Sequence, residues 1–297
     1  MARVISPVTQ LPDAQVRPLL VAYAAQVRAR RLQSLLVLVL LAAAVALSSV
    51  SAEVSPLRFF ANIGNFTSYV WRLCHLDSGA LVWTNPTEWF WGLGRWLRLL
   101  GETLLMAYVG TILGSAGAFF LSFLAAANVA PNRWLRIAVR RFCELCRTVP
   151  ELVFALIFVI AFGLGPVGGV LALAIHCLGA LGKLFAEVVE NIDMKPVEGV
   201  HATGALWHVA MRYGALPQVL PTFVSYALLR FEINVRSAAV IGFVGAGGIG
   251  VDLLEAIRKF YYSDVSAMLV LIVITVSIID FLTGIVRHRL IGMGERR

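Results

Sequence analysis

The chain has 297 residues, of which 59% are hydrophobic and 14% charged, with a formal net charge of +8 and a mean hydropathy of +0.82. Soluble domains carry about 25% charged residues, so this chain has too few charges to cover a surface in contact with water. The composition predicts an integral membrane protein and excludes a disordered, collagen-like or disulfide-stapled chain.

Uncharged stretches predict an all-α transmembrane bundle, because a helix needs about 20 apolar residues to cross the bilayer core. The segment Gly163-Leu164-Gly165-Pro166 is a turn signal that divides one long apolar stretch into two helices. We therefore expect about six crossings, over residues 32–52, 103–132, about 148–163, 166–185, 213–251 and 265–286. A signal peptide ending near Ala52 is the alternative for the first crossing, although the region before it is long for such a peptide.

Basic residues predict the orientation. Arginine and lysine gather before the first crossing, after the second, after the fourth and at the end of the chain. The positive-inside rule puts these segments in the cytoplasm, so both termini are expected there. The chain then divides into a cytoplasmic N-terminal segment (1–31), a first transmembrane helix (32–52), an extracytoplasmic loop (53–100), a transmembrane domain (101–287) and a cytoplasmic tail (288–297). Within the loop, the apolar residues of 89–100 predict a helix lying along the outer membrane surface.

Two sequence patterns imitate chemistry that we do not expect. Residues Gly245, Gly247 and Gly250 match the dinucleotide fingerprint, but they follow a membrane crossing instead of a strand. With Gly248, they predict a gating or packing turn. The pair Cys143 and Cys146 lacks the further ligands of a zinc site. We expect no metal, no bound cofactor, no catalytic residues and no nucleic-acid partner for this chain.

The segment 186–217 predicts two short helices on the cytoplasmic face. Pro196 suits a helix start, Gly204 allows a turn, Gly214 is expected to end the second helix, and Pro217 to begin the next crossing. A compact helix–turn–helix there is a docking surface for a cytoplasmic partner.

The spacing of this segment resembles the signature loop of ABC importer permeases, E-A-A-x3-G-x9-I-x-L-P. Glu198, Gly204, Leu216 and Pro217 match it, whereas Gly199, Val200 and Gly214 depart from its letters. Residues 147–155, 229–242 and 244–250 resemble the permease subunit of phosphonate importers, and the resemblance extends over about residues 90–287.

The resemblance implies a type I ABC importer permease in a bacterial inner membrane, carrying phosphonate, phosphate or phosphite by alternating access. It implies a second permease chain, identical or a close paralogue. It also implies an extracytoplasmic substrate-binding protein and an ATPase dimer that holds ATP and Mg²⁺. Glu198, Ala202 and Gly204 are then expected to contact the ATPase. A permease for methionine or another small solute, a secondary transporter and, less favoured, a membrane-bound transferase are the alternatives.

Four polar residues interrupt the fifth crossing and are candidates for the translocation path: Arg230, Glu232, Asn234 and Arg236. Charges deep in a bilayer are costly and normally face a bundle interior or a watery cavity. At 100° per residue, 230 and 234 share one face of a helix, and 232 and 236 lie on roughly the opposite face. Only one pair can therefore line a central path on a regular helix. A position near the outer interface, with the arginines snorkelling, is the alternative.

Overall fold

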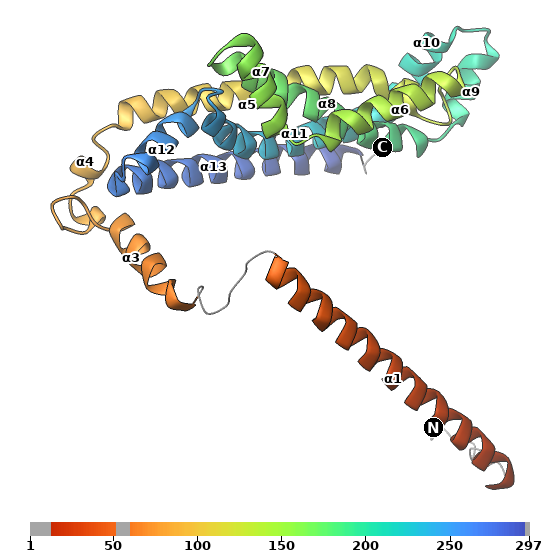
Figure 1. Ribbon diagram of the computed structural model, residues 1–297. Coiled ribbons are helices and arrows are strands. Elements are labelled where there is room, and N and C mark those ends of the chain that lie inside the picture. The colour runs from red at the N-terminus through yellow and green to blue at the C-terminus, as the bar shows by residue number, and fades with distance from the viewer. Residues whose placement is uncertain (1–12, 52–59, 295–297) are drawn as a thin grey trace, which may run out of the picture. The chain divides into compact units, whose positions relative to one another are not determined.

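The computed structural model describes residues 13–51 and 60–294. Residues 1–12 of the expected N-terminal segment, 52–59 around the end of the first crossing, and 295–297 of the tail lie outside the described part. Helices and their connecting turns form the described part (Figure 1). The helices are α1 (Asp13–Ser51), α3 (Ile63–Leu73), α4 (Pro86–Trp89), α5 (Leu93–Ala125), α6 (Arg133–Thr148), α7 (Glu151–Phe162), α8 (Pro166–Glu190), α9 (Lys195–Ala202), α10 (Trp207–Ala210), α11 (Leu216–Ile241), α12 (Ile249–Arg258) and α13 (Tyr262–Gly294).

The chain forms two compact units, residues up to Tyr69 and residues from Val70 onward. The first contains α1, whose apolar part, Val21–Ser49, is long enough to cross a membrane and includes most of the expected first crossing. The second contains the helical body, from α4 to α13.

Four helices of the described part are long and apolar enough to span a bilayer, and the number rises to six if two bent helix pairs each count as one span. The four are α1, α5, α8 and α13. The bent pairs are α6 with α7, at 86°, and α10–α11 with α12, at 50°. This range includes the six crossings expected from the sequence.

The structure does not contain the separate interfacial helix that we expected over residues 89–100. Helix α4 ends at Trp89, and α5 begins at Leu93 and runs without interruption into the second crossing. The reason is burial: Trp96 and Leu100 are 3% and 5% exposed, because they pack with Leu253 and Met268 of α12 and α13. The aromatic residues therefore extend a spanning helix instead of forming a separate surface helix.

The expected third crossing also differs. Helix α6 reaches Thr148, and Pro150 separates it from α7. The 12 residues of α7 rise only about 18 Å, against a bilayer core of about 30 Å. Helix α7 does not cross a membrane by itself, and its first residue, Glu151, lies at the bend.

Small residues hold the centre of the body together. A Cβ added at Gly110 would lie 2.8 Å from Leu173 Cβ, and one at Gly114 would lie 2.6 Å from Cys177 Cβ. Helices α5 and α8 can approach this closely because those positions lack side chains. Farther along, the rings of Phe185 and Phe223 stack with centroids 4.0 Å apart.

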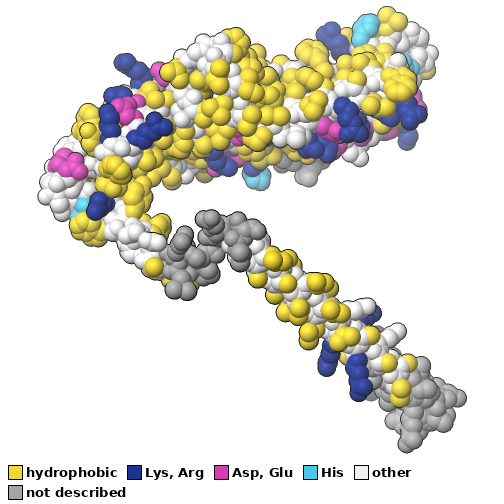
Figure 2. Space-filling view, in the orientation of Figure 1, with side chains coloured by type: hydrophobic (Ala, Val, Ile, Leu, Met, Phe, Trp, Pro, Cys, Tyr) yellow, Lys and Arg dark blue, Asp and Glu magenta, His cyan; other side chains and the backbone are white. Residues whose placement is uncertain are grey.

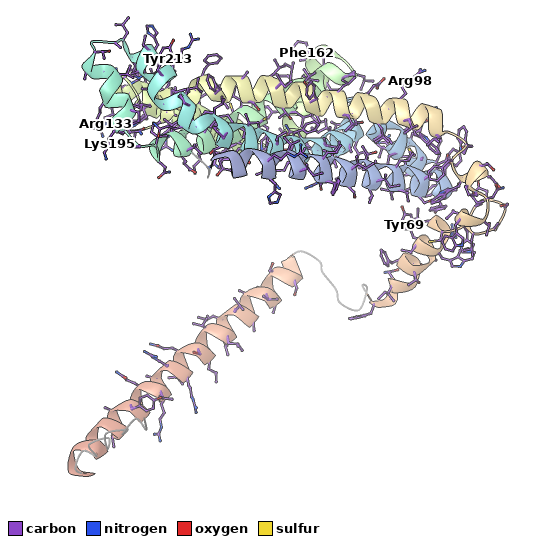
Figure 3. All side chains as sticks on the ribbon, turned by 180° about the vertical axis from the view of Figure 1, so that it is seen from behind. Tyr69, Arg98, Arg133, Phe162, Lys195 and Tyr213 are labelled. Atoms are coloured by element: carbon purple, nitrogen blue, oxygen red, sulfur yellow. The ribbon has the colours of Figure 1, made fainter. Side chains whose placement is uncertain are left out.

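The outer faces of the body are apolar. Ile160 and Phe120 are 82% and 69% exposed. Figure 2 shows hydrophobic side chains across the middle of the visible face and charged side chains mostly toward its two ends. A bilayer covers a surface with this pattern. Figure 3 places Arg133, Lys195 and Tyr213 together at one end, which we call the α9 end, and Arg98 toward the other, which we call the α4 end.

Candidate functional site

The residues of the predicted docking surface lie at the α9 end. Glu198 and Ala202 are exposed on α9, four residues apart and therefore on one face of the helix. Gly204 is exposed and has φ +80°, so the chain reverses there between α9 and α10. Leu216 and Pro217 form the first turn of α11, with Leu216 half-buried and Pro217 exposed.

Gly214 does not end the second helix as expected. A π-helical turn, Met211–Ala215, joins α10 directly to α11. Gly214 is buried in that turn, and a Cβ there would lie 2.8 Å from Val197 Cα. The glycine therefore serves the close packing of α9 against the start of α11.

Sequence reasoning missed two contacts that attach α10 and α8 to the loop between α5 and α6. We call residues 126–132, between α5 and α6, the support loop. Trp207 of α10 donates from Nε1 to the carbonyl of Val129 at 2.6 Å, and Asn128 donates to the carbonyl of Val189 at 2.8 Å. Neither pair shares a sequence motif, so only the three-dimensional packing reveals them.

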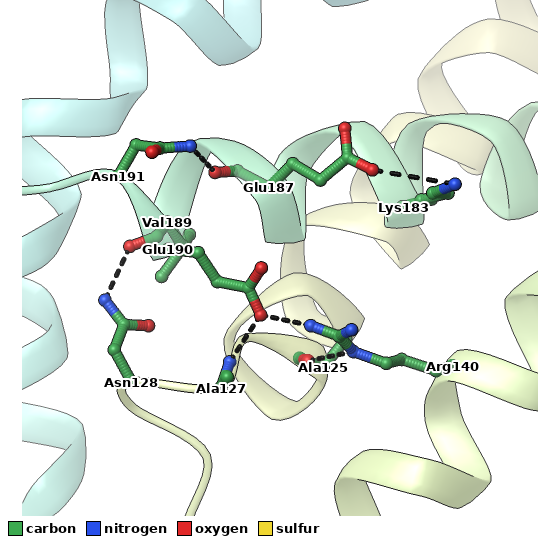
Figure 4. Close-up of polar contacts among 9 residues, drawn as sticks. All are labelled: Ala125, Ala127, Asn128, Arg140, Lys183, Glu187, Val189, Glu190 and Asn191. Carbon is green, nitrogen blue, oxygen red and sulfur yellow. Dashed lines mark hydrogen bonds and ion pairs between the residues drawn. The ribbon is translucent and has the colours of Figure 1, made fainter.

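An ion pair fixes the support loop to α8 (Figure 4). The Glu190 carboxylate at the end of α8 accepts from the Ala127 amide at 2.7 Å and pairs with Arg140 of α6. Arg140 also donates from Nε to the carbonyl of Ala125, the last residue of α5, at 2.8 Å. The Glu190 carboxylate thus joins α8 to α6 and to the support loop, and Arg140 extends the link to the end of α5.

The four candidate path residues on α11 divide between two faces, as the helical spacing predicts. On one face, Arg236 pairs with Asp280 of α13 at 2.7 Å, and Thr283 of α13 donates to Glu232. These contacts occupy that face with α13.

The opposite face of α11 is directed at α5, α7 and α8. Asn234 is fully buried and donates to Thr111 of α5 at 2.8 Å. Arg230 contacts His176 of α8. The structure therefore brings Arg230 and Asn234 into the interior of the bundle and separates them from Glu232 and Arg236.

Arg230 belongs to a group of polar side chains linked through His176. The Glu151 carboxylate lies 3.0 Å from His176 Nδ1, and Ser237 donates to its other oxygen. We call Glu151, His176, Arg230 and Ser237 the polar cluster. An arginine inside a membrane bundle needs a counter-charge, and Pro150 marks a helix break next to Glu151. These two signals could have pointed to Glu151 as an acidic neighbour of the arginine.

The glycine turn, residues 245–250, uses left-handed backbone conformations that favour glycine. Gly245, Gly247 and Gly248 have φ of +86°, +84° and +74°. The carbonyl of Gly245 accepts from the Gly165 amide at 3.1 Å, and Thr103 Oγ1 accepts from the Ile249 amide at 3.0 Å. The glycine turn therefore packs against α5 and against the turn between α7 and α8. A gating role stays a prediction.

Charged residues and indoles form a polar surface at the α4 end. Arg95 pairs with Asp252 at 2.8 Å, and Trp91 donates to Asp264 at 2.8 Å. Lys259, just beyond α12, pairs with Glu255 at 2.6 Å, and this hydrogen bond and the carboxylate charge raise the pKa of Lys259.

Cys143 and Cys146 are buried free thiols. Positions for added Cβ atoms at Gly179 and Gly182 of α8 lie within 3 Å of the two cysteines. The cysteines therefore pack α6 against α8. In residues 13–51 and 60–294, no group of His, Cys, Asp and Glu has the arrangement of a metal site.

A family model described as "Binding-protein-dependent transport system inner membrane component" matches residues 118–291. The chain is 40% identical over 198 residues to a phosphite transport system permease protein of Stutzerimonas stutzeri, covering 67% of this chain and 72% of that protein. It is 55% identical over 121 residues to a putative cryptic phosphonate transport system permease protein of Escherichia coli K12, covering 41% of this chain and 99% of the relative.

Among solved structures, a chain of the MetNI methionine ABC transporter in an inward-facing conformation superposes with a TM-score of 0.58 and 22% identity. The match covers 69% of this chain and 98% of that one. At this identity the likeness shows the fold alone, which is that of a type I ABC importer permease.

Proposed function

Because this chain belongs to the family of binding-protein-dependent transport system inner membrane components, it is an inner-membrane ABC importer permease, and we propose that it carries phosphonate, phosphate or phosphite. The observation that carries the choice of substrate is the likeness to a phosphite permease over two thirds of the chain. The family separates the chain from secondary transporters. The methionine alternative has only the likeness of fold in its favour.

The docking surface supports the proposal of an ATPase partner. Glu198, Ala202 and Gly204 are exposed at the tip of the α9 end. Trp207 and Glu190 hold this tip firmly on the bundle through the support loop. A surface of this kind can pass a movement of a bound ATPase to the spanning helices. ATP and Mg²⁺ would be bound by the ATPase dimer, and this chain would perform no covalent chemistry.

The two ends of the body suit different partners. Figure 3 places Arg133 at the α9 end, and Arg136 and Arg140 follow it on α6, so this end would face the cytoplasm. The distribution of basic residues along the sequence predicts the same side for both termini. The α4 end, with Arg95, Asp252 and Trp91, would then meet the extracytoplasmic substrate-binding protein. A second permease chain, identical or a close paralogue, would complete the path.

The interior face of α11 is the better candidate for the path. Arg236 has its partner on α13, whereas Arg230 points into the bundle beside α7 and α8. A guanidinium suits an oxyanion because its planar fork bonds two oxygens.

Transport by the reconstituted complex tests the function. The complex would be assembled with its ATPase and with binding protein loaded with methylphosphonate, phosphite, phosphate or methionine. We expect uptake and stimulated ATP hydrolysis with one or more of the three phosphorus oxyanions and none with methionine. Arg230→Gln should lower uptake more than Arg236→Gln, while assembly and basal ATPase activity persist. Uptake of methionine alone would overturn the proposal.

A further inference from the structure

The polar cluster is balanced in charge without any ligand. Glu151 is the first residue of α7, at the 86° bend after α6. One of its carboxylate oxygens accepts from the Ser237 hydroxyl, and the other lies 3.0 Å from His176 Nδ1. Arg230 is in contact with the same imidazole nitrogen. An imidazole and a hydroxyl from two helices therefore contact a carboxylate from a third, and the guanidinium contacts the same imidazole.

This set of groups is one that proteins use to hold phosphate and phosphonate. Charge-assisted hydrogen bonds from arginine and imidazole, with a hydroxyl donor, are the strong contacts to such oxyanions. Arg230 also keeps one donor in reserve, because its buried Nε has no hydrogen-bond partner within the described residues. The cluster is thus able to bond more acceptor oxygens than the Glu151 carboxylate supplies.

We propose that the polar cluster is a transit site for a tetrahedral phosphorus oxyanion, and that the Glu151 carboxylate occupies the site when it is empty. This inference rests on the proposed function, which supplies the anion. An oxyanion held by Arg230 and the His176 imidazole would lie beside the Glu151 carboxylate, which is 3.0 Å from the same imidazole nitrogen, and like charges a few ångströms apart repel strongly in a low-dielectric interior. The arriving anion must therefore displace the carboxylate.

Two physical consequences make such an exchange useful. The carboxylate lowers the cost of keeping Arg230 in the membrane while no substrate is present. It also keeps the affinity for the passing anion low, and conduction requires a site that binds weakly enough to release. Glu151 has room to move, since its side chain is 25% exposed and it directly follows Pro150 at the helix break.

Phosphate binding to the assembled complex tests the inference. Equilibrium dialysis with radiolabelled inorganic phosphate would be done without nucleotide and without binding protein. Glu151→Gln keeps the size of the side chain but removes its charge. We expect this variant to bind phosphate about tenfold or more tightly than the unaltered complex, because removing a competing charge is worth over 1.4 kcal/mol. Adding Arg230→Gln to Glu151→Gln should abolish the gain.

The chain provides a matched control on the other face of α11. Asp280→Asn removes a carboxylate that pairs directly with an arginine, Arg236, but no imidazole or serine hydroxyl contacts that guanidinium among the described residues. It should not create phosphate binding. An equal gain in Asp280→Asn would overturn the inference, since any unpaired arginine would then suffice.

Other outcomes are equally decisive. Unchanged phosphate affinity in an assembled Glu151→Gln complex would overturn the inference and leave the proposed function standing. Glu151→Ala is the second variant, and failure of both variants to assemble would mark Glu151 as purely structural. Failure of the unaltered complex to transport any phosphorus oxyanion would instead count against the proposed function.

Discussion

At the scale of single residues, the closest approach in the glycine turn lies at Gly250. A Cβ there would be 2.1 Å from the Ala239 carbonyl oxygen and 2.9 Å from Gly242 Cα. The backbones of α11 and α12 must move apart to admit a methyl group. We expect Gly250→Ala to destabilise the protein by about 1–3 kcal/mol, seen as a lower midpoint in thermal unfolding of the detergent-solubilised complex. Gly94→Ala, on α5 with no atom within 4 Å of its added Cβ, is the control and should leave the midpoint unchanged or slightly raised. Equal midpoints for the two variants would show that the turn is loosely packed.

At the scale of elements, the turn between α9 and α10 depends on Gly204. Its φ of +80° is unfavourable by roughly 1–2 kcal/mol for a residue with a Cβ. Gly204→Val should alter the docking surface, so that ATP hydrolysis persists while anion uptake falls. Gly199→Ala is a suitable control, because it lies on α9 with free space around it and matches the alanine of the signature loop. Uptake and hydrolysis are measured together in proteoliposomes. Normal uptake by Gly204→Val with a bound ATPase would contradict the docking assignment.

The support loop makes a separate prediction about Glu190. Glu190→Ala removes the acceptor of the Ala127 amide and the counter-charge of Arg140. Losing a part-exposed hydrogen bond and ion pair of this kind costs about 0.5–1.5 kcal/mol, so the loop should be held less firmly on α8 and hydrolysis should become less coupled to uptake. Glu187→Ala, which breaks the more exposed pair with Lys183 at 3.6 Å, should have little effect. The ratio of anions taken up to ATP hydrolysed is the measurement, and equal ratios in the two variants would rule out a coupling role for the loop.

Local spacing accounts for what the sequence could predict. Turn glycines and Pro196 predicted the helix pair α9–α10, and a rotation of 100° per residue predicted that Arg230 and Arg236 face apart. The partners of these residues could not be predicted, because they depend on how helices distant in the chain align. Thus Glu151 and His176 were visible only as isolated polar residues. The continuous helix through Gly214 was missed because its cause, contact with Val197, lies outside its own segment.

At the scale of the whole molecule, the arrangement of charges makes a prediction about sidedness. Ala80 and Ala202 are both exposed, the first close to α4 and the second on α9. In a background with Cys74→Ser, cysteines at these positions should react with an impermeant maleimide from opposite sides of the membrane. Ala202→Cys should react in inside-out vesicles and Ala80→Cys in right-side-out vesicles, made from cells that lack the ATPase. Reaction of both from one side would refute the orientation.

The π-helical turn at Met211–Ala215 has a mechanical consequence. It leaves no flexible linker between α10 and α11, whose 26 residues extend about 39 Å to the glycine turn. We expect the two elements to move together as one lever, with residues 242–248 as its pivot. Tilting such a rod by about 10° displaces its far end by roughly 7 Å but moves Arg230, less than half as far from the pivot, by only about 3 Å. A large movement at the docking surface would thus cause a smaller movement, of about 3 Å, at the polar cluster. A movement of that size is enough to form or break hydrogen bonds.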